Sequence, residues 1–442
     1  MRVFSLTTLA ATLTFAAAAA AGPGVLPQNA QPSIDSTSPG TIILVRPLAS
    51  TVNGHQQIIG SAIFSIHDDG SDLLQLTPYA EGVFNVPDAW PAPFDALENW
   101  VGSAFSPGGH YSQFLQAYTG SGSTSNNPYV SGKYYVMDAS GQQRLPLFHD
   151  GNDLPSGNNS PSYGYLTWGP AGTHLIAFSN SANGAPVNHA CVGVIHPDGT
   201  GERKLWCPQG YYPQYNQAVE SLRWSGDGRS LLAYVELTTP DSPFPHGSDL
   251  YRVDVATGAA TLVQANVTSN LHGPGGDLSY DGHEIVFQTN TPGSCTPDQQ
   301  EQMVLCARNM LTGQQVALVD PSGALILAGG QLLLTPGGSQ AIVNTIDRYS
   351  STEELYVINT DGTGLRQLTQ PCVPLDPNGN IVVTWAAVRL SPDGQQLLAN
   401  CYVQQETPYV RLPTQMYVIN LADGSARYVA DGAAYDWHVP TP

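Results

Sequence analysis

The chain has 442 residues and a formal net charge of −20, from 35 acidic and 15 basic side chains. This charge disfavours nucleic acids and anionic membrane surfaces as partners, because their phosphate groups would be repelled. Only 11% of the residues are charged, and a chain of this length can bury a large core.

The first 22 residues have the pattern of a secretory signal peptide. Arg2 precedes an apolar run rich in Ala and Thr, and small residues follow it. This order of basic, apolar and small residues is typical of a leader that is removed on export. Residues 23–40 are rich in Pro, Ser, Gly and Gln, which predicts a flexible lead-in. We therefore expect a secreted or periplasmic protein without stable membrane insertion, whose folded domain spans residues 41–442.

Residues 41–45 (TIILV) begin the domain as a short apolar strand. A hairpin pattern then appears at residues 63–77 and again at residues 355–369, and the two segments match at seven of fifteen positions. In both, alternating apolar residues flank an Asp-Gly pair, which signals a tight turn because Gly tolerates a positive φ. Five further copies occupy residues 134–148, 192–206, 251–265, 306–320 and 417–431.

These seven copies contain two turn variants. Their turn glycines are Gly70, Gly141, Gly199, Gly258, Gly313, Gly362 and Gly424. In one variant the polar residue that closes the first strand stands three positions before the glycine, as in His67, Asp138, His196 and Asn359. In the other it stands four positions before, as in Asp254, Asn309 and Asn420. The second variant is therefore expected to contain one extra turn residue.

A second hairpin pattern alternates with the first. Its six copies occupy residues 104–115, 166–178, 222–234, 278–287, 332–343 and 388–400. A seventh copy is split, with residues 433–439 as its first strand and residues 41–45 as its second. Two hairpins make a four-stranded unit of about 50 to 60 residues, and repeats of such units are typical of a β-propeller.

We therefore predict an all-β fold, a seven-bladed β-propeller of four-stranded antiparallel blades whose strands run outward from the centre. Strands 41–45 and 433–439 would pair in one blade and close the ring, which removes open sheet edges. One alternative is six blades, if the split unit is not a true blade. Another is a row of independent β-sandwiches, which the regular alternation of hairpins without linkers disfavours.

The six cysteines form three neighbouring pairs. In an exported protein an even number of cysteines indicates disulfides. Cys191 and Cys207 stand eight residues to either side of Gly199, so they should face each other across a hairpin. We predict the disulfides Cys191–Cys207, Cys295–Cys306 and Cys372–Cys401, all at strand ends or in loops and outside the shared core.

The long connections all fall at one end of the predicted blades, because short Asp-Gly and Pro-Gly turns occupy the other end. Long loops on a rigid scaffold often carry function. Aromatic residues gather in them, which suits contact with sugars or peptides, although part of them should only pack the loops onto the blades. The candidate ligand-binding residues are Tyr79, Trp90, Trp100, Tyr211, Tyr212 and Tyr215.

Motifs for catalysis and metal binding are few. The esterase motif GxSxG and the phosphate loop GxxxxGK[ST] are absent. His283-Glu284 lacks the second His that a zinc protease helix carries four residues after the first. Asp150, Asn152 and Asp153 have a spacing that suits Ca²⁺, but turns use such residues more often. We predict no catalytic residue, no metal and no cofactor.

The segments WSGDG (224–228), LSPDG (390–394) and YVINTDGTGLRQLT (356–369) resemble the repeats of TolB-like propellers. The resemblance covers residues 41–439, and similar repeats occur in the propellers of prolyl-oligopeptidase-like peptidases and of some polysaccharide lyases. The N-terminal domain of TolB and the nucleophile motif of the peptidases have no counterpart here, and the metal-binding His cluster of the lyases is not assigned to residues of this chain.

This resemblance implies an exported binding or scaffolding module. We expect a monomeric, non-enzymatic protein that binds a protein or a glycan through the face with the long loops. The alternative is a polysaccharide lyase or hydrolase with a metal site at the propeller pore.

Overall fold

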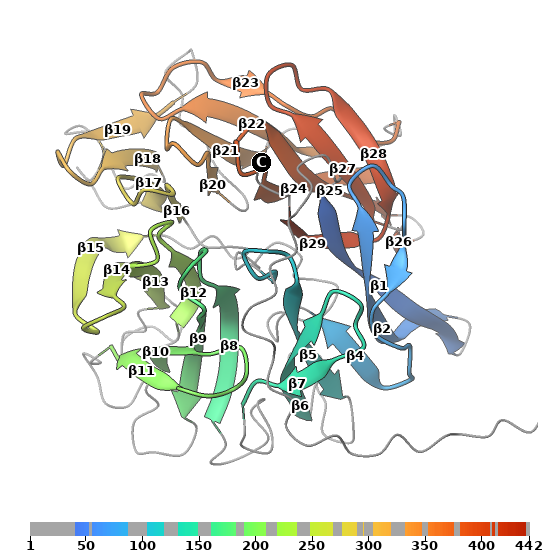
Figure 1. Cartoon of the computed structure of the whole chain (residues 1–442). Helices are drawn as coiled ribbons and strands as arrows, with labels where there is room; N and C mark the ends of the chain where they lie inside the picture. The colour runs from blue at the N-terminus through green and yellow to red at the C-terminus, as the bar shows by residue number, and fades with distance from the viewer. Residues whose placement is uncertain are drawn as a thin grey trace, which may run out of the picture. The chain divides into compact units, whose positions relative to one another are not determined.

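The predicted hairpins are present in a computed structural model of the chain, whose described residues form strands and turns without helices (Figure 1). The structure describes residues 40–52, 55–86, 104–118, 131–148, 161–182, 190–208, 219–236, 248–267, 276–289, 295, 304–319, 332–346, 352–374, 381–406, 409–411 and 414–438. The predicted signal peptide and the lead-in up to residue 39 lie outside the described residues. Residues 33–442 form one compact unit, and the following paragraphs concern this unit alone.

The strands pair in antiparallel sets that run from an inner to an outer strand (Figure 1). The first set is β29 (Ala433–His438), β1 (Thr41–Val52), β2 (His55–His67) and β3 (Leu74–Gln75). The second is β5 (Tyr111–Tyr118), β6 (Ser131–Asp138) and β7 (Arg144–Pro146), with a single bridge from Phe105 to Ser112 in the inner position. The third is β8 (Pro161–Trp168), β9 (Ile176–Ala182), β10 (Ala190–Ile195) and β11 (Arg203–Trp206).

The remaining sets continue in chain order. The fourth is β12 (Val219–Trp224), β13 (Ser230–Glu236), β14 (Ser248–Asp254) and β15 (Ala260–Val267). The fifth is β16 (Gly276–Leu278), β17 (Glu284–Thr289), β18 (Val304–Asn309) and β19 (Gln315–Leu318). The sixth is β20 (Leu333–Leu334), β21 (Gln340–Ile346), β22 (Thr352–Asn359) and β23 (Arg366–Gln367). The seventh is β24 (Ile381–Leu390), β25 (Gln396–Glu406), β27 (Gln415–Asn420) and β28 (Ala426–Asp431).

Additional pairings join some of these sets into larger sheets. β4 (Val83–Val86) connects β2 to β5, Val267 of β15 pairs with Thr289 of β17, and β22 pairs with β24. β26 (Tyr409–Arg411) adds to the edge of β25. The described strands thus fall into sheets of eight, four, eight and nine strands. Three of these sheets contain strands from two sets, so the sheets do not correspond one to one with blades. The number of seven blades therefore stays a prediction.

The hydrophobic core lies between the faces of neighbouring sets. Ile42 and Leu44 of β1 pack against the seventh set, whereas Ile43 and Val45 pack toward the second. Successive side chains of a strand point to opposite faces, so a strand buried on both faces reads as a continuous apolar run such as TIILV. Sets that pack face to face in chain order make this unit a β-propeller, and the pairing of β1 with β29 confirms that the two predicted end strands share one sheet.

The turn glycines have the predicted backbone conformation. The φ angles of Gly70, Gly141, Gly199, Gly258, Gly313, Gly362 and Gly424 lie between 71° and 88°. The two predicted turn variants are also present. The amide of Gly362 donates to the carbonyl of Asn359, three residues earlier, whereas the amide of Gly258 donates to the carbonyl of Asp254, four residues earlier. The extra residue therefore changes the turn, and the strands still pair directly beside it: Val253 pairs with Ala260 and Arg252 with Thr261.

The turns of both hairpin patterns occupy one end of the sheets. The N–H of Met310 donates to the carbonyl of His283, and the N–H of Leu421 donates to that of Gln395. Each of these bonds joins the outer hairpin turn of a set to the inner hairpin turn of the same set. The opposite end of the sheets, which we call the long-loop face, holds the connections between hairpins.

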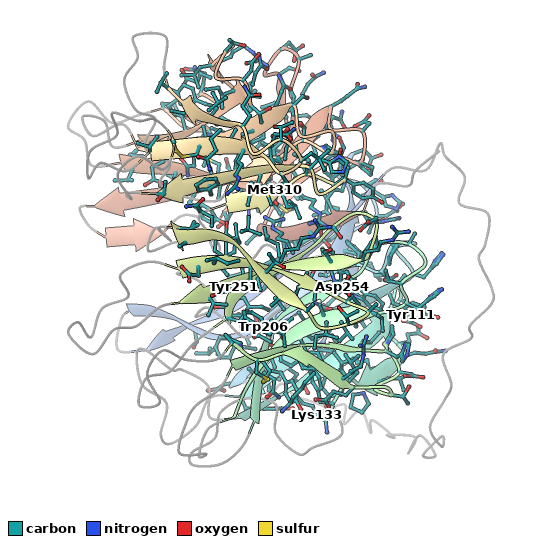
Figure 2. The ribbon with its side chains drawn as sticks, turned by 90° about the vertical axis from the view of Figure 1, so that its left-hand side faces the viewer. Tyr111, Lys133, Trp206, Tyr251, Asp254 and Met310 are labelled. Atoms are coloured by element: carbon teal, nitrogen blue, oxygen red, sulfur yellow. A yellow bond between two sulfur atoms is a disulfide. The ribbon has the colours of Figure 1, made fainter. Side chains whose placement is uncertain are left out.

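Neighbouring sets also touch near their outer edges. Figure 2 shows Trp206 of β11 beside Tyr251 of β14, with ring centroids 4.7 Å apart. Asp254 lies where β14 reaches its turn (Figure 2). This aromatic contact links the outer strand of the third set to the fourth, so inter-set packing extends from the inner strands to the periphery.

Candidate functional site

Of the six aromatic residues predicted to bind ligand, the structure describes Tyr79. Trp90, Trp100, Tyr211, Tyr212 and Tyr215 lie outside the described residues. The side chain of Tyr79 is 37% exposed and follows the outer strand β3, where the chain turns into a connection of the long-loop face. The environment of Tyr79 therefore defines the candidate site.

Tyr79 belongs to a group of side chains at the seam between the first and seventh sets. We call it the Arg46 cluster: Arg46, Phe64, Tyr79, Tyr417, Tyr428 and Asp431. The guanidinium of Arg46 lies over the ring of Phe64, 5.3 Å from its centroid. The ring of Tyr79 also packs against Phe64, with 5.8 Å between the two ring centroids. Residues from the strands that close the ring thus meet at one surface.

The guanidinium of Arg46 is fixed in position. Its Nε and Nη2 atoms donate to the carbonyl oxygen of Asp431 over 3.1 and 2.9 Å. The Asp431 carboxylate in turn accepts a hydrogen bond from the hydroxyl of Tyr428 over 2.9 Å. Asp431 ends the outer strand β28 at the same end of the sheets as Tyr79, so the Arg46 cluster lies toward the long-loop face.

A series of aromatic rings connects this surface with the core. Tyr428 is 48% exposed, and its ring centroid lies 5.7 Å from that of Tyr417. Tyr417 lies 5.0 Å from Trp385, which is fully buried between the sixth and seventh sets. Exposed rings anchored in this way lose little further conformational freedom when a ligand binds, which favours affinity.

The hydroxyl groups of this cluster are uncharged at neutral pH. Burial raises the pKa of Tyr79, although the positive charge of Arg46 opposes this. Burial and then the Asp431 carboxylate raise the pKa of Tyr417 and Tyr428. Neutral hydroxyls, a fixed guanidinium and exposed ring faces together offer the hydrogen bonds and stacking surface that sugars and peptide groups require.

Residues that were candidates for metal or catalytic roles have other functions or lie outside the described residues. Asp150, Asn152 and Asp153 are not described. His283 pairs with Asp281 of its own turn, with 3.2 Å between Nδ1 and Oδ2. Glu284 accepts a hydrogen bond from Asn309 across the strand pair. Within the described parts of the chain, no group of three or more His, Cys, Asp or Glu side chains is placed to hold a metal ion.

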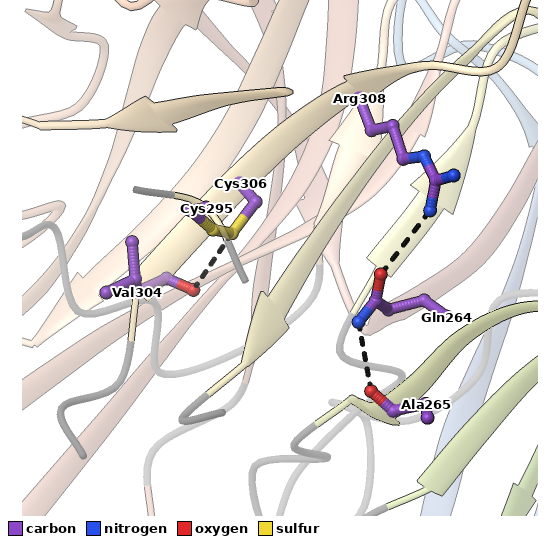
Figure 3. The surroundings of a disulfide bond; sticks show 6 residues. All are labelled: Gln264, Ala265, Cys295, Val304, Cys306 and Arg308. Atoms are coloured by element: carbon purple, nitrogen blue, oxygen red, sulfur yellow. Dashed lines mark hydrogen bonds between the residues drawn. A yellow bond between two sulfur atoms is a disulfide. The ribbon is translucent and has the colours of Figure 1, made fainter. Parts of the chain in front are cut away.

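The three predicted disulfides, Cys191–Cys207, Cys295–Cys306 and Cys372–Cys401, are present. Their predicted location outside the core is wrong for two of them. Cys306 lies inside β18, where Figure 3 shows its bond to Cys295, and Cys401 lies inside β25. Both are fully buried in hydrophobic clusters between sets. Cys295 and Cys372 pack against these same clusters. These disulfides therefore tie loop residues to the core.

No family model matches the chain, and no curated protein matches it in sequence. Solved structures do match its fold. The chain is similar to puromycin hydrolase, with 13% identity and a TM-score of 0.52, over 92% of this chain and 56% of that one. It is also similar to the β-propeller domain of the Trilobed protease from Pyrococcus furiosus, with 10% identity and a TM-score of 0.50, over 88% of this chain and 95% of that one. The chain thus spans little more than half of the hydrolase, and these likenesses show the fold alone.

Proposed function

We propose that this chain is an exported propeller of the TolB-like repeat type that binds a protein or a glycan through its long-loop face. The Arg46 cluster forms part of the binding surface. Two observations support export: the leader pattern of residues 1–22 and the three disulfides, which persist in oxidising compartments. The chain acts as a secreted or periplasmic binding module.

One observation supports the binding surface most directly. Tyr79 and Tyr428 come from different sets and are 37% and 48% exposed. Both are linked to the fixed guanidinium of Arg46, Tyr79 through the ring of Phe64 and Tyr428 through Asp431. A hydrophobic core has no need for these exposed faces, whereas aromatic residues beside Arg are enriched where proteins bind ligands. Glycan rings stack on such tyrosines, and peptide groups bond to the same guanidinium and hydroxyls.

The test compares the double variant Tyr79→Ala/Tyr428→Ala with the wild type. Purified protein is applied to an array of neutral and acidic oligosaccharides and to immobilised peptides of varied charge. The control is Tyr280→Ala, because Tyr280 is 60% exposed but lies in an inner hairpin turn at the opposite end of the sheets. We expect the double variant to lose at least about tenfold in affinity for any probe that the wild type binds, which is the usual scale for two aromatic contacts.

Retention of all binding by the double variant would remove the Arg46 cluster from the proposal.

The same preparations are incubated with polysaccharides, and new reducing ends or unsaturated products are measured. Wild-type turnover of a polysaccharide would overturn the non-enzymatic part of the proposal in favour of a lyase or hydrolase.

A further inference from the structure

The inner strands carry charged residues at one equivalent position of the repeat. Arg223, Asp277 and Arg389 each stand two residues before the serine that opens an inner hairpin turn. Asp436 holds the same place in β29, because Trp437 corresponds to Trp224 in the repeat. The inner strands lie around the centre of the unit (Figure 1), and all four residues belong to inner strands.

The four residues form two similar relays. The Nε atom of Arg223 lies 3.3 Å from Oδ1 of Asp277, and the Nε atom of Arg389 lies 3.3 Å from Oδ1 of Asp436. Oδ2 of Asp277 accepts the N–H of Leu334 over 2.7 Å. Each relay therefore runs from an arginine through an aspartate to the backbone of a third inner strand.

The second relay ends in the same way. Oδ2 of Asp436 accepts the N–H groups of Ala104 and Phe105 over 2.8 and 3.0 Å. Oδ1 of Asp436 also accepts the N–H of Trp437, and Oδ1 of Asp277 accepts that of Leu278. The carboxylates thus receive several hydrogen bonds, which leaves them little capacity to bind the remaining guanidinium N–H groups.

The guanidinium of Arg223 has unused hydrogen-bonding capacity. Arg223 is 9% exposed, and its Nη2 has no hydrogen-bond partner among the described residues. A buried N–H of a charged group without an acceptor is costly, so an acceptor at this place would stabilise the protein. The carboxylate of Asp227, four residues later, accepts hydrogen bonds from Ser225 and Arg229 inside its own turn.

The positive charge of Arg389 acts on Arg223. Burial lowers the pKa of Arg223, Asp277 opposes this, and the positive charge of Arg389 lowers it further. β12 and β24 belong to the fourth and seventh sets, which are not neighbours in the order of the sets. Both are inner strands, so the two arginines belong to strands that lie around the same centre of the unit (Figure 1). Arg389 keeps 30% of its side chain exposed, which leaves it accessible to a solute.

We propose that the centre of this propeller binds a small oxyanion, a carboxylate, phosphate or sulfate group, between the guanidinium groups of Arg223 and Arg389. Arginine suits this role because its planar fork of N–H groups matches two oxygens of such an anion. The ligand is small because acidic turns surround this end of the inner strands, including Asp227, Asp281 and Asp393, and would repel a polyanion. This site is separate from the Arg46 cluster and goes beyond the proposed function.

The experiment measures thermal unfolding and isothermal titration with sulfate, phosphate and acetate as probes. Ionic strength is held constant with sodium chloride, because salt alone screens surface charges. A ligand that binds the folded state raises the unfolding temperature in a saturable way. We expect saturable binding of at least one probe by the wild type. Acetate binding indicates a carboxylate site, whereas binding of sulfate and phosphate alone indicates a tetrahedral oxyanion site.

Variants identify the residues responsible. Arg389→Gln should lower the affinity at least about tenfold, since it removes a charged hydrogen-bond donor. Arg389→Lys keeps the ion pair with Asp436 but loses the fork, so it should bind with intermediate affinity. The control is Arg229→Gln, because Arg229 is 83% exposed and pairs within its turn. Absence of saturable binding, or equal binding by the wild type and Arg389→Gln, which would reveal an adventitious ion only, overturns the proposal.

Discussion

At the scale of single residues, the aspartates of the turns act as local clamps. In the outer hairpin of the sixth set, Oδ1 of Asp361 accepts the N–H and the hydroxyl of Thr363 over 2.9 and 2.7 Å. These hydrogen bonds lower the pKa of Asp361. Asp198 and Asp423 bond to their own turns in the same way, and their pKa values are also lowered. The acidic composition of the chain therefore serves turn structure as well as solubility.

This arrangement predicts acid sensitivity. A carboxyl whose pKa is lower in the folded state stabilises that state at pH values above its unfolded pKa, near 4. The contribution is lost as the pH falls through the lower folded value. We expect the unfolding temperature to fall below about pH 4, and we expect Asp361→Asn to be less stable than the wild type at pH 7 but nearly equal at pH 2. Calorimetry across this range measures both.

A constant difference between the two proteins at all pH values would show that the Asp361 charge does not matter. Asp72→Asn is a suitable control, because Asp72 is also exposed at a turn, where its carboxylate lies 3.3 Å from Nδ1 of His67.

The residue scale also shows what the sequence could predict. The turn glycines and their two variants follow from a few neighbouring residues, and both predictions are confirmed. Tyr79 was predicted as a ligand contact from its loop, and this role stays a prediction. Arg46, Tyr428 and Asp431 were missed, because Arg46 and Asp431 are 385 positions apart and meet only when β1 and β29 pair. Equivalent positions in the repeat were the available signal for Arg223 and Arg389.

At the scale of elements, strand pairs within a hairpin were predictable and the contacts between sets were not. The position of Cys401 illustrates the difference. Its pairing with Cys372 follows from sequence proximity, but its burial depends on how β25 packs against the sixth set. The same disulfide thus contributes through packing as well as through chain connectivity.

This difference predicts unequal effects of disulfide removal. Loop-closure entropy is worth about 3 kcal/mol for Cys191–Cys207 and somewhat more for the longer Cys372–Cys401 loop. Cys372→Ala/Cys401→Ala also removes buried side-chain atoms beside Trp385, at a further cost of about 1 kcal/mol. We expect this variant to unfold at lower urea concentration than Cys191→Ala/Cys207→Ala. Equal midpoints in urea would indicate that the buried disulfide adds nothing through packing.

At the scale of the whole unit, closure depends on the last strand. β29 pairs with β1 from Thr41 to Val45, and Trp437 packs between the first and seventh sets. Asp436 bonds to the inner position of the second set and pairs with Arg389 of the seventh. One short strand therefore holds three sets together, which local sequence patterns alone do not reveal.

Removal of this strand should open the ring. Deletion of residues 433–442 would leave one side of β1 without a partner, and an unpaired apolar edge strand promotes association between chains. We expect the truncated protein to form oligomers or aggregates in light-scattering measurements. Trp437→Ala keeps the strand but removes a buried ring, at a cost of about 3 to 5 kcal/mol, so it should remain monomeric with a lower unfolding temperature. A truncated protein that stays monomeric with the stability of the wild type would show that β29 does not close the propeller, because neither its hydrogen bonds to β1 nor its inter-set contacts would then contribute to folding.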